Sequence, residues 1–175
     1  VNKSFLQRDP DSGRYLAHEI MRQFAEERLR ESGDADAINE AHSTFYLKTV
    51  GDALPAIQGQ GQTEAFTAID WDFENIRAAL TWAARHGNAS MLRHAAHPLG
   101  IYFDRRAMYS EGHSIFSSAA DEVRAIMPSP ERDDALAVLL CWAGFYASYF
   151  RQQQVAEPLV HESLSLVRDD SFPEV

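Results

Sequence analysis

The first residues whose types and spacing suggest chemistry are those of the run His18-Glu19-Ile20-Met21-Arg22. A zinc protease of the His-Glu-x-x-His type has a second histidine where this chain has Arg22, so the run does not predict that metal site. An imidazole near the start of a helix can donate a hydrogen bond to a phosphate. It can equally cap or pack the helix, and the sequence leaves both roles open for His18.

His94 and His97 form the second group, because they lie three residues apart on one expected helix. A metal site needs a third and usually a fourth ligand, and His113 on the next helix is the nearest additional candidate. The same pair with Glu111 or Asp121 defines an alternative, an all-α enzyme with a histidine and carboxylate site. We expect no metal ligand and no catalytic residue, because histidine pairs at this spacing are usually surface or half-buried side chains.

Three acidic residues and one thiol complete the chemically interesting side chains. Asp70, Asp72 and Glu74 are expected at the start of a helix, where negative charge suits the exposed N–H groups. Cys141 lies beside a tryptophan in an apolar segment and is expected to be a small buried side chain. No Gly-x-x-x-x-Gly-Lys-Ser/Thr sequence occurs, so this chain alone is not expected to bind or hydrolyse ATP.

The segment 69–83 is the clearest helix in the sequence. Its apolar residues follow steps of four, three, four and three, which places them in one stripe. Gly87 is the expected end of this helix. Trp71 and Trp82 are too large to leave in water, so we expect other helices to pack over this one.

Outside this helix, turn and periodicity signals divide the chain. Residues 3–7 and 14–16 are expected strands, joined by a turn at 9–13 that contains proline and glycine. Pro55 and the glycines at 59 and 61 break the chain before the central helix. The remaining expected helices cover residues 17–30, 35–50, 89–103, 108–126, 132–150 and 155–167. The sequence therefore predicts an all-α fold with a small N-terminal β-hairpin.

The last four expected helices contain a repeat of small residues. Two sets with spacings of 12 and then 7 residues are offset by 44 residues (144 − 100): Gly100, Gly112 and Ala119, and Gly144, Ala156 and Ser163. Small side chains at these intervals allow two helices of a hairpin to approach closely. The pattern is similar to tetratricopeptide (TPR) repeats and predicts antiparallel helical hairpins stacked as a right-handed solenoid.

Aromatic residues of this repeat suggest a binding surface. Tyr102, Phe103, Tyr146, Tyr149 and Phe150 fall on helices that would line the concave groove of such an array. Grooves of this kind bind peptides or small effectors. Alternatively, these rings are covered by further repeats, or they drive self-association.

Composition excludes several classes of protein. With 16 basic and 26 acidic residues the net charge is −10, which does not suit a nucleic-acid-binding surface. A single cysteine fits a reducing cytoplasm, and no apolar run is long enough for a membrane span. We therefore expect a cytoplasmic protein without direct contacts to nucleic acid or membrane, cut from a longer chain.

Two segments resemble one family. The run at 14–25, Arg-Tyr-Leu-Ala-His-Glu-Ile-Met-Arg-Gln-Phe-Ala, resembles the winged-helix signature of STAND and NB-ARC ATPases, although Ala17 and Glu19 depart from the usual residues. The run Asn-Ile-Arg-Ala-Ala-Leu at 75–80 is similar to the helical region behind the ATPase module of LuxR-type and related regulators. The resemblance implies that residues 1–32 end a winged-helix subdomain, 33–87 are linking helices and 88–175 are TPR-like hairpins.

The resemblance also implies a function. In the family, the histidine matching His18 reaches the β-phosphate of bound ADP, so ATP or ADP would be the cofactor of the full-length parent. This chain would then be a non-catalytic region for protein interaction or effector sensing in a transcriptional regulator. A free-standing helical-repeat adaptor that binds a protein or peptide is the alternative that needs no nucleotide.

Overall fold

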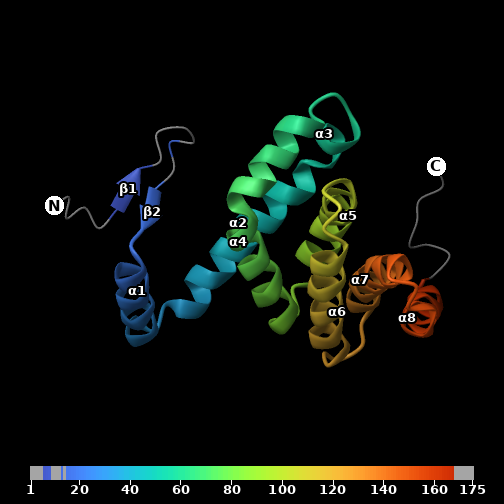
Figure 1. Cartoon of the computed structure of the whole chain (residues 1–175). Helices are drawn as coiled ribbons and strands as arrows, with labels where there is room; N and C mark the ends of the chain where they lie inside the picture. Colours follow the sequence, from blue (N-terminus) through green and yellow to red (C-terminus); the bar gives the residue numbers. More distant parts are fainter. Residues whose placement is uncertain (1–5, 9–12, 14, 168–175) are drawn as a thin grey trace. The chain divides into compact units, whose positions relative to one another are not determined.

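The computed structural model describes residues 6–8, 13 and 15–167, and it is almost entirely helical (Figure 1). Strands β1 (Leu6–Arg8) and β2 (Tyr15–Ala17) pair antiparallel, with Leu6 opposite Ala17. The helices of the described part are α1 (Glu19–Ser32), α2 (Ala35–Asp52), α3 (Leu54–Gln58), α4 (Gln62–Arg85), α5 (Ala89–Arg105), α6 (Tyr109–Arg124), α7 (Pro130–Tyr149) and α8 (Gln153–Leu166). None of them is long and apolar enough to cross a membrane.

The chain divides into two compact units, residues 1–39 and 40–175. The first contains the two strands, α1 and the start of α2. No side chain of α1 is buried, and Gly33 ends this helix with a positive φ of 81°. The predicted strand residues 3–5 and 14 and the turn residues 9–12 lie outside the described residues. The predicted three-part division at 32/33 and 87/88 stays a prediction.

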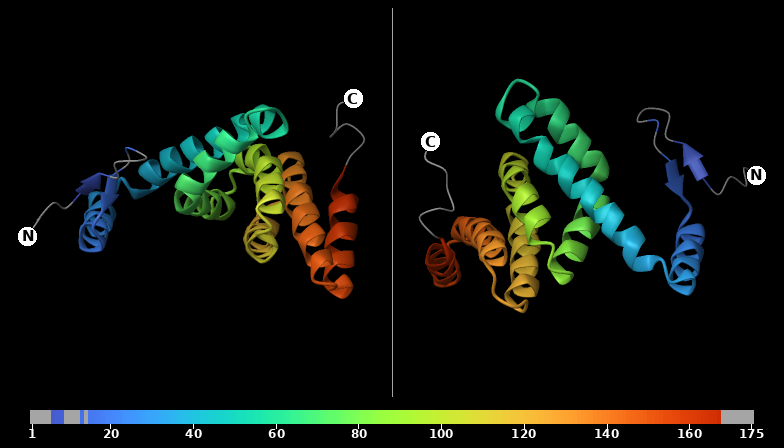
Figure 2. Two further views of the ribbon diagram at one scale, coloured as in Figure 1. Left: turned by 45° about the horizontal axis from the view of Figure 1, so that its top comes forward. Right: turned by 180° about the vertical axis from the view of Figure 1, so that it is seen from behind.

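Three helix pairs make up most of the second unit (Figure 2). They are helix α2 with α4, and the hairpins α5 with α6 and α7 with α8. The hydroxyl of Ser43 on α2 donates to the carbonyl oxygen of Ala79 on α4 at 2.8 Å, within the first pair. The short helix α3 lies in the connection between them, where the sequence predicted only a break. Proline in the first turn suits this short helix, because its missing N–H has no partner there anyway.

The central helix differs from its prediction at the N-terminus. The apolar stripe is confirmed, since Ile69, Ile76, Leu80 and Ala83 are all at most 4% exposed. However, α4 begins at Gln62, so Asp70, Asp72 and Glu74 lie inside the helix rather than at its start. The physical reason is Phe66, which is buried at the same helical spacing and extends the stripe by one turn.

Two further expectations about individual side chains are wrong. Trp71 is 55% exposed rather than covered by another helix. Cys141 is exposed on α7 and is not the buried side chain that its apolar neighbours suggested. Partial burial nevertheless raises the pKa of its thiol, which disfavours the reactive thiolate.

The core of the second unit is built around aromatic rings and close helix contacts. Tyr102, Phe103, Phe116 and Tyr146 are at most 2% exposed and contact one another edge-on or stacked. All six small residues of the repeat are buried, as close helix packing requires. A Cβ atom on Gly100 would lie 2.0 Å from the ring of Trp142, so glycine here admits an indole from the next hairpin.

Candidate interaction site

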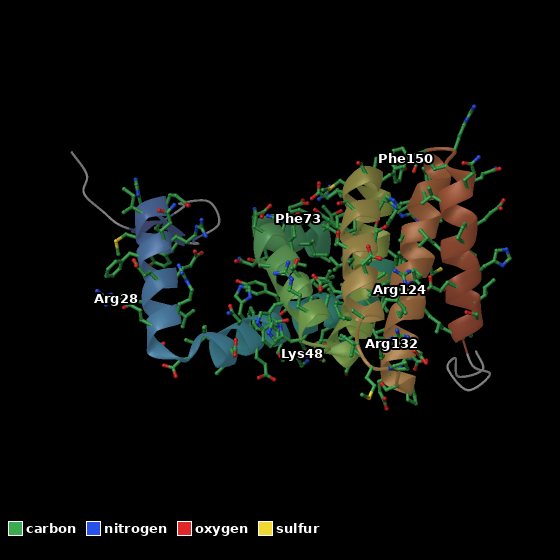
Figure 3. The ribbon with its side chains drawn as sticks, turned by 90° about the horizontal axis from the view of Figure 1, so that it is seen from below. Arg28, Lys48, Phe73, Arg124, Arg132 and Phe150 are labelled. Atoms are coloured by element: carbon green, nitrogen blue, oxygen red, sulfur yellow. The ribbon has the colours of Figure 1, made fainter. Side chains whose placement is uncertain are left out.

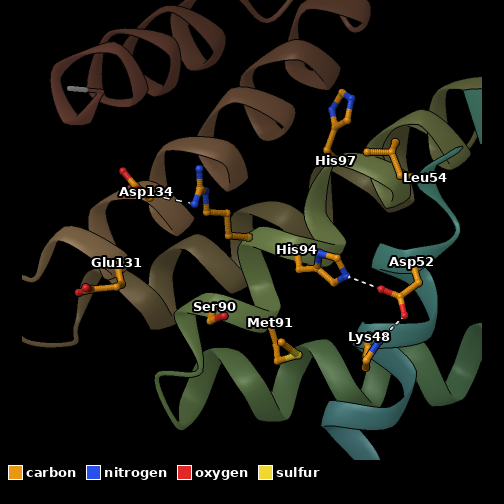
Figure 4. A pocket seen from close by; sticks show the side chains of 10 residues that line it. Lys48, Asp52, Leu54, Ser90, Met91, His94, His97, Glu131 and Asp134 are labelled. Atoms are coloured by element: carbon orange, nitrogen blue, oxygen red, sulfur yellow. Dashed lines mark hydrogen bonds and ion pairs between the residues drawn. The ribbon is translucent and has the colours of Figure 1, made fainter. Parts of the chain in front are cut away.

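The second unit contains an open cleft of about 670 Å³. It crosses the first helices of the three hairpins, α2, α5 and α7, with Leu54 of α3 at its edge (Figure 4). Its polar lining carries both signs of charge: Lys48, Asp52, Ser90, Arg93, His94, His97, Glu131 and Asp134.

One wall of the cleft is a three-residue charged cluster that joins α2 to α5. Asp52 binds Lys48 through one carboxylate oxygen and contacts Nε2 of His94 at 3.0 Å through the other. Lys48 and then His94 lower the pKa of the Asp52 carboxyl below its usual value. The imidazole of His94 occupies space left by Gly51, where a Cβ atom would lie 1.9 Å from the ring. The cluster therefore depends on a glycine in α2.

The other wall joins α5 to α7. Arg93 forms an ion pair with Asp134 at 3.9 Å, and His97 lies 5.8 Å from the ring of Trp142, centroid to centroid. A polar contact on one wall and an ion pair on the other thus connect three successive hairpins across one cleft. Side chains of both signs can bind the charged and polar groups of a peptide or small effector.

The structure does not assemble the alternative enzyme site. His113 uses Nδ1 to contact the carbonyl oxygen of Ala143 at 2.9 Å, within the helix packing. Glu111 lines a separate hollow between α4 and α6, and Asp121 binds Arg124 at 2.5 Å. Of the histidine and carboxylate candidates, only His94 and His97 share the cleft. Within the described residues, no group of three or more His, Cys, Asp or Glu side chains is placed to hold a metal ion.

The predicted aromatic groove needs a correction. Tyr102, Phe103 and Tyr146 are at most 2% exposed, so their rings pack the core and do not line a surface. Only Tyr149 and Phe150, 48% and 45% exposed at the end of α7, remain accessible (Figure 3 labels Phe150). The reason is that α7 packs onto both α5 and α6 and covers the inward-facing rings of the second hairpin.

His18 lies at the start of α1, as the sequence predicted. It is the N-cap residue, and its Nδ1 accepts a hydrogen bond from the backbone N–H of Ile20 at a long 3.4 Å. The side chain is exposed. This geometry fits a cap, and the predicted contact with a nucleotide stays a prediction.

Sequence reasoning missed most of the cleft. Lys48 and Asp52 are four residues apart, a spacing that favours an ion pair on one helix, so that signal was present. Gly51 gave no such signal, because the expected helix ended at residue 50, whereas α2 continues through Gly51 to Asp52. Asp134 could not be assigned, because its partner lies on a different hairpin.

Comparisons with known proteins give a partial match. No protein-family model matches the chain, and no solved structure matches it. The chain is similar to "Putative HTH-type transcriptional regulator Mb0914c" of Mycobacterium bovis, and to MT0914 and Rv0890c of Mycobacterium tuberculosis, which have the same description. Each is 29% identical over 126 residues, which are 71% of this chain and 14% of the relative. The chain thus spans about one seventh of the relatives' length.

Proposed function

We propose that this chain is a non-catalytic region for protein interaction or effector sensing in a cytoplasmic, STAND-type transcriptional regulator. The similarity to proteins described as transcriptional regulators supports the regulatory role. The stacked hairpins with a repeated 12-and-7 spacing support a TPR-like array. The β-hairpin and α1 would end a winged-helix subdomain, and ATP or ADP would bind to the absent module of the parent.

The observation that carries the proposal is the cleft across α2, α5 and α7. Its walls contain contacts between hairpins: Asp52 contacts Nε2 of His94, and Arg93 forms an ion pair with Asp134. A ligand that competes for these charges would change how the three hairpins are held together. Binding in the cleft would therefore shift the conformational equilibrium of a connected switch domain without any chemical step in this chain.

The first test is charge reversal in the cleft of the longer regulator, read out by a reporter gene. Arg93→Glu removes the pair with Asp134 and places two carboxylates next to each other. It should reduce the response to effector or partner by at least about tenfold, since like charges side by side disfavour the arrangement of the site. Arg105→Glu is the matched control, because this exposed arginine lies at the other end of α5, outside the cleft. Equal responses in both variants would reject the cleft as the sensing site.

The second test addresses the nucleotide switch. We expect ADP or ATP to co-purify with the longer regulator and to be reduced by His18→Ala, with the exposed His161→Ala as control. If no nucleotide is found in any variant, the alternative gains support. That alternative is a helical-repeat adaptor in which the cleft binds a protein or peptide. In it, the role of His18 is only to cap the N-terminus of α1.

A further inference from the structure

A second hollow lies between α7 and α8 and is an open groove of about 340 Å³. Its floor contains small residues of the repeat, Gly144 and Ala156, and one border is Val160, which is 39% exposed. Phe145 on α7, 38% exposed, forms part of the other border. The exposed lining is mostly apolar, although Ser148, Gln153, Glu157 and His161 also line the groove. The groove is separate from the charged cleft.

The 44-residue offset identifies the equivalent groove of the preceding hairpin. Subtracting 44 from Gly144, Ala156 and Val160 gives Gly100, Gly112 and Phe116, on α5 and α6. Both grooves thus have a small residue on each helix and an apolar residue one turn further along the second helix. Of the two, the α5–α6 groove is occupied in the structure.

Helix α7 fills the α5–α6 groove with aromatic side chains four residues apart. The ring of Trp142 lies where a Cβ atom of Gly100 would be, and the ring of Tyr146 lies 2.7 Å from a Cβ built on Gly112. Both rings stack near Phe116, at centroid distances of 6.4 and 6.2 Å. The occupant of this groove is therefore a helix with aromatic residues at i and i+4.

Polar contacts at the edges of the α5–α6 groove also hold α7 in place. The hydroxyl of Tyr146 donates to the carbonyl oxygen of Gly100 at 2.6 Å. The ring of Tyr149 stacks on Tyr109 at 4.1 Å, and its hydroxyl bonds Asp104 at 3.3 Å. Asp104 and Tyr109 correspond to Ser148 and Gln153 of the open groove, so polar edge positions are retained there.

We propose that the α7–α8 groove is a docking site for one further helix of the same kind as α7. This helix is amphipathic, carries large aromatic side chains at i and i+4, and belongs to a hairpin that continues the array in a longer polypeptide. The argument is continuity, because the groove repeats the residue pattern of an interface that the structure shows occupied. In the mycobacterial relatives the matched region is 14% of the chain, so each has ample polypeptide outside it.

The test uses a fluorescently labelled peptide with the sequence of residues 130–151, which includes α7, titrated against the 175-residue chain. We expect saturable binding by fluorescence anisotropy. Val160→Lys should weaken binding at least about tenfold, since it places a charge in an apolar interface. Val155→Lys is the matched control, because Val155 is on the same helix and 42% exposed but does not line the groove. A peptide with Trp142→Ala and Tyr146→Ala should bind at least about tenfold more weakly as well.

Three results would overturn the proposal. The first is no saturable binding to the unaltered chain, and the second is equal binding to both lysine variants. The third is a concentration-dependent dimer in sedimentation that Val160→Lys dissociates, because the occupant would then be a second copy of this chain. Each result leaves the charged cleft unaffected, since no cleft residue is altered.

Discussion

The hairpins α5–α6 and α7–α8 share a sequence pattern, yet their equivalent positions have very different surroundings. Phe116 on α6 is fully buried under α7, whereas its equivalent Val160 on α8 is 39% exposed. A Cβ atom on Gly100 would contact the indole ring of Trp142 from the next hairpin. The atoms nearest to a Cβ atom on Gly144 all belong to α8, the other helix of the same hairpin. The comparison shows that the repeated residues determine the form of the groove between two helices. Whether the next hairpin covers that groove determines how much the side chains in it stabilise the fold.

The test with the largest expected effect truncates the apolar side chains at the two equivalent positions, Phe116 and Val160. Phe116→Ala should cost about 3–5 kcal/mol of the free energy of unfolding, because it leaves a cavity in a fully buried aromatic cluster. Val160→Ala should cost less than about 1 kcal/mol, because much of this side chain is in water. Urea denaturation followed by circular dichroism measures both values. Similar costs would mean that the two hairpins are equally covered.

The next test adds a methyl group at the two repeat glycines. Gly100→Ala should destabilise by about 1–3 kcal/mol, because the new Cβ would be 2.0 Å from the rigid ring of Trp142. A Cβ atom added to Gly144 would lie 2.8 Å from its nearest neighbour, a methyl group of Val160, and that side chain can move toward solvent. A helical alanine is favoured over glycine by about 1 kcal/mol, so Gly144→Ala should be close to neutral. Urea midpoints of the two variants provide the measurement, and a larger loss for Gly144→Ala would contradict the comparison.

Much of this fold followed from periodicity in the sequence, and the exceptions have a common physical cause. Apolar residues at helical spacing identified α4, α5, α6, α7 and α8, because burial of one stripe is a local property. The start of α4 was placed too late, because the acidic run at 70–74 was interpreted as a helix N-terminus. Asp70 instead accepts a hydrogen bond from Tyr102 at 2.7 Å and also binds Arg106 of the next hairpin, partners that no local pattern reveals.

The candidate site was less predictable than the fold. The aromatic residues were predicted to line one groove, but which of them face the core depends on how α7 crosses α5 and α6. The cleft needed long-range information, since Asp52 and His94 are 42 residues apart in sequence. Repeats did predict one feature of the interface, because the small residues mark where helices approach closely.

The third test compares the buried tyrosines at equivalent positions, Tyr102 and Tyr146. Burial raises the pKa of both phenols, and the hydrogen bond to Asp70 adds to the effect at Tyr102. Each Tyr→Phe change should cost about 1–2 kcal/mol at neutral pH, because a buried hydrogen bond is lost. Stability from the raised pKa values is complete below the unfolded pKa of about 10 and is lost as pH rises above it.

The measurement is the urea midpoint between pH 8.5 and 11. The unaltered protein should lose stability through this range, and the double variant Tyr102→Phe, Tyr146→Phe should lose less. Tyr15→Phe is the control, because this tyrosine is 68% exposed. An identical slope in the double variant would show that the two phenols ionise as freely in the folded protein as in the unfolded chain.

The smallest test concerns the ion pairs between the second helices of successive hairpins. Arg85 on α4 makes one contact with Glu122 on α6 at 3.1 Å, whereas Arg124 on α6 holds Glu162 on α8 through two bonds of 2.9 Å. The second pair is also less exposed, at 37% for each side chain. Arg124→Ala should therefore cost up to about 1 kcal/mol, and Arg85→Ala only a few tenths.

These pairs also differ in their expected pH dependence. The hydrogen bonds from Arg124 lower the pKa of the Glu162 carboxyl below its usual value, so the stability from this pair is complete above that usual value. It is lost as the pH falls through the lowered pKa, and Arg124→Ala should remove that part of the acid sensitivity between pH 5 and 3. Arg85→Ala, which removes the single contact with Glu122, is measured in parallel. Parallel acid titrations of the unfolding free energy decide the point, and equal profiles for both variants would mean that the two-bond geometry confers no advantage over a single contact.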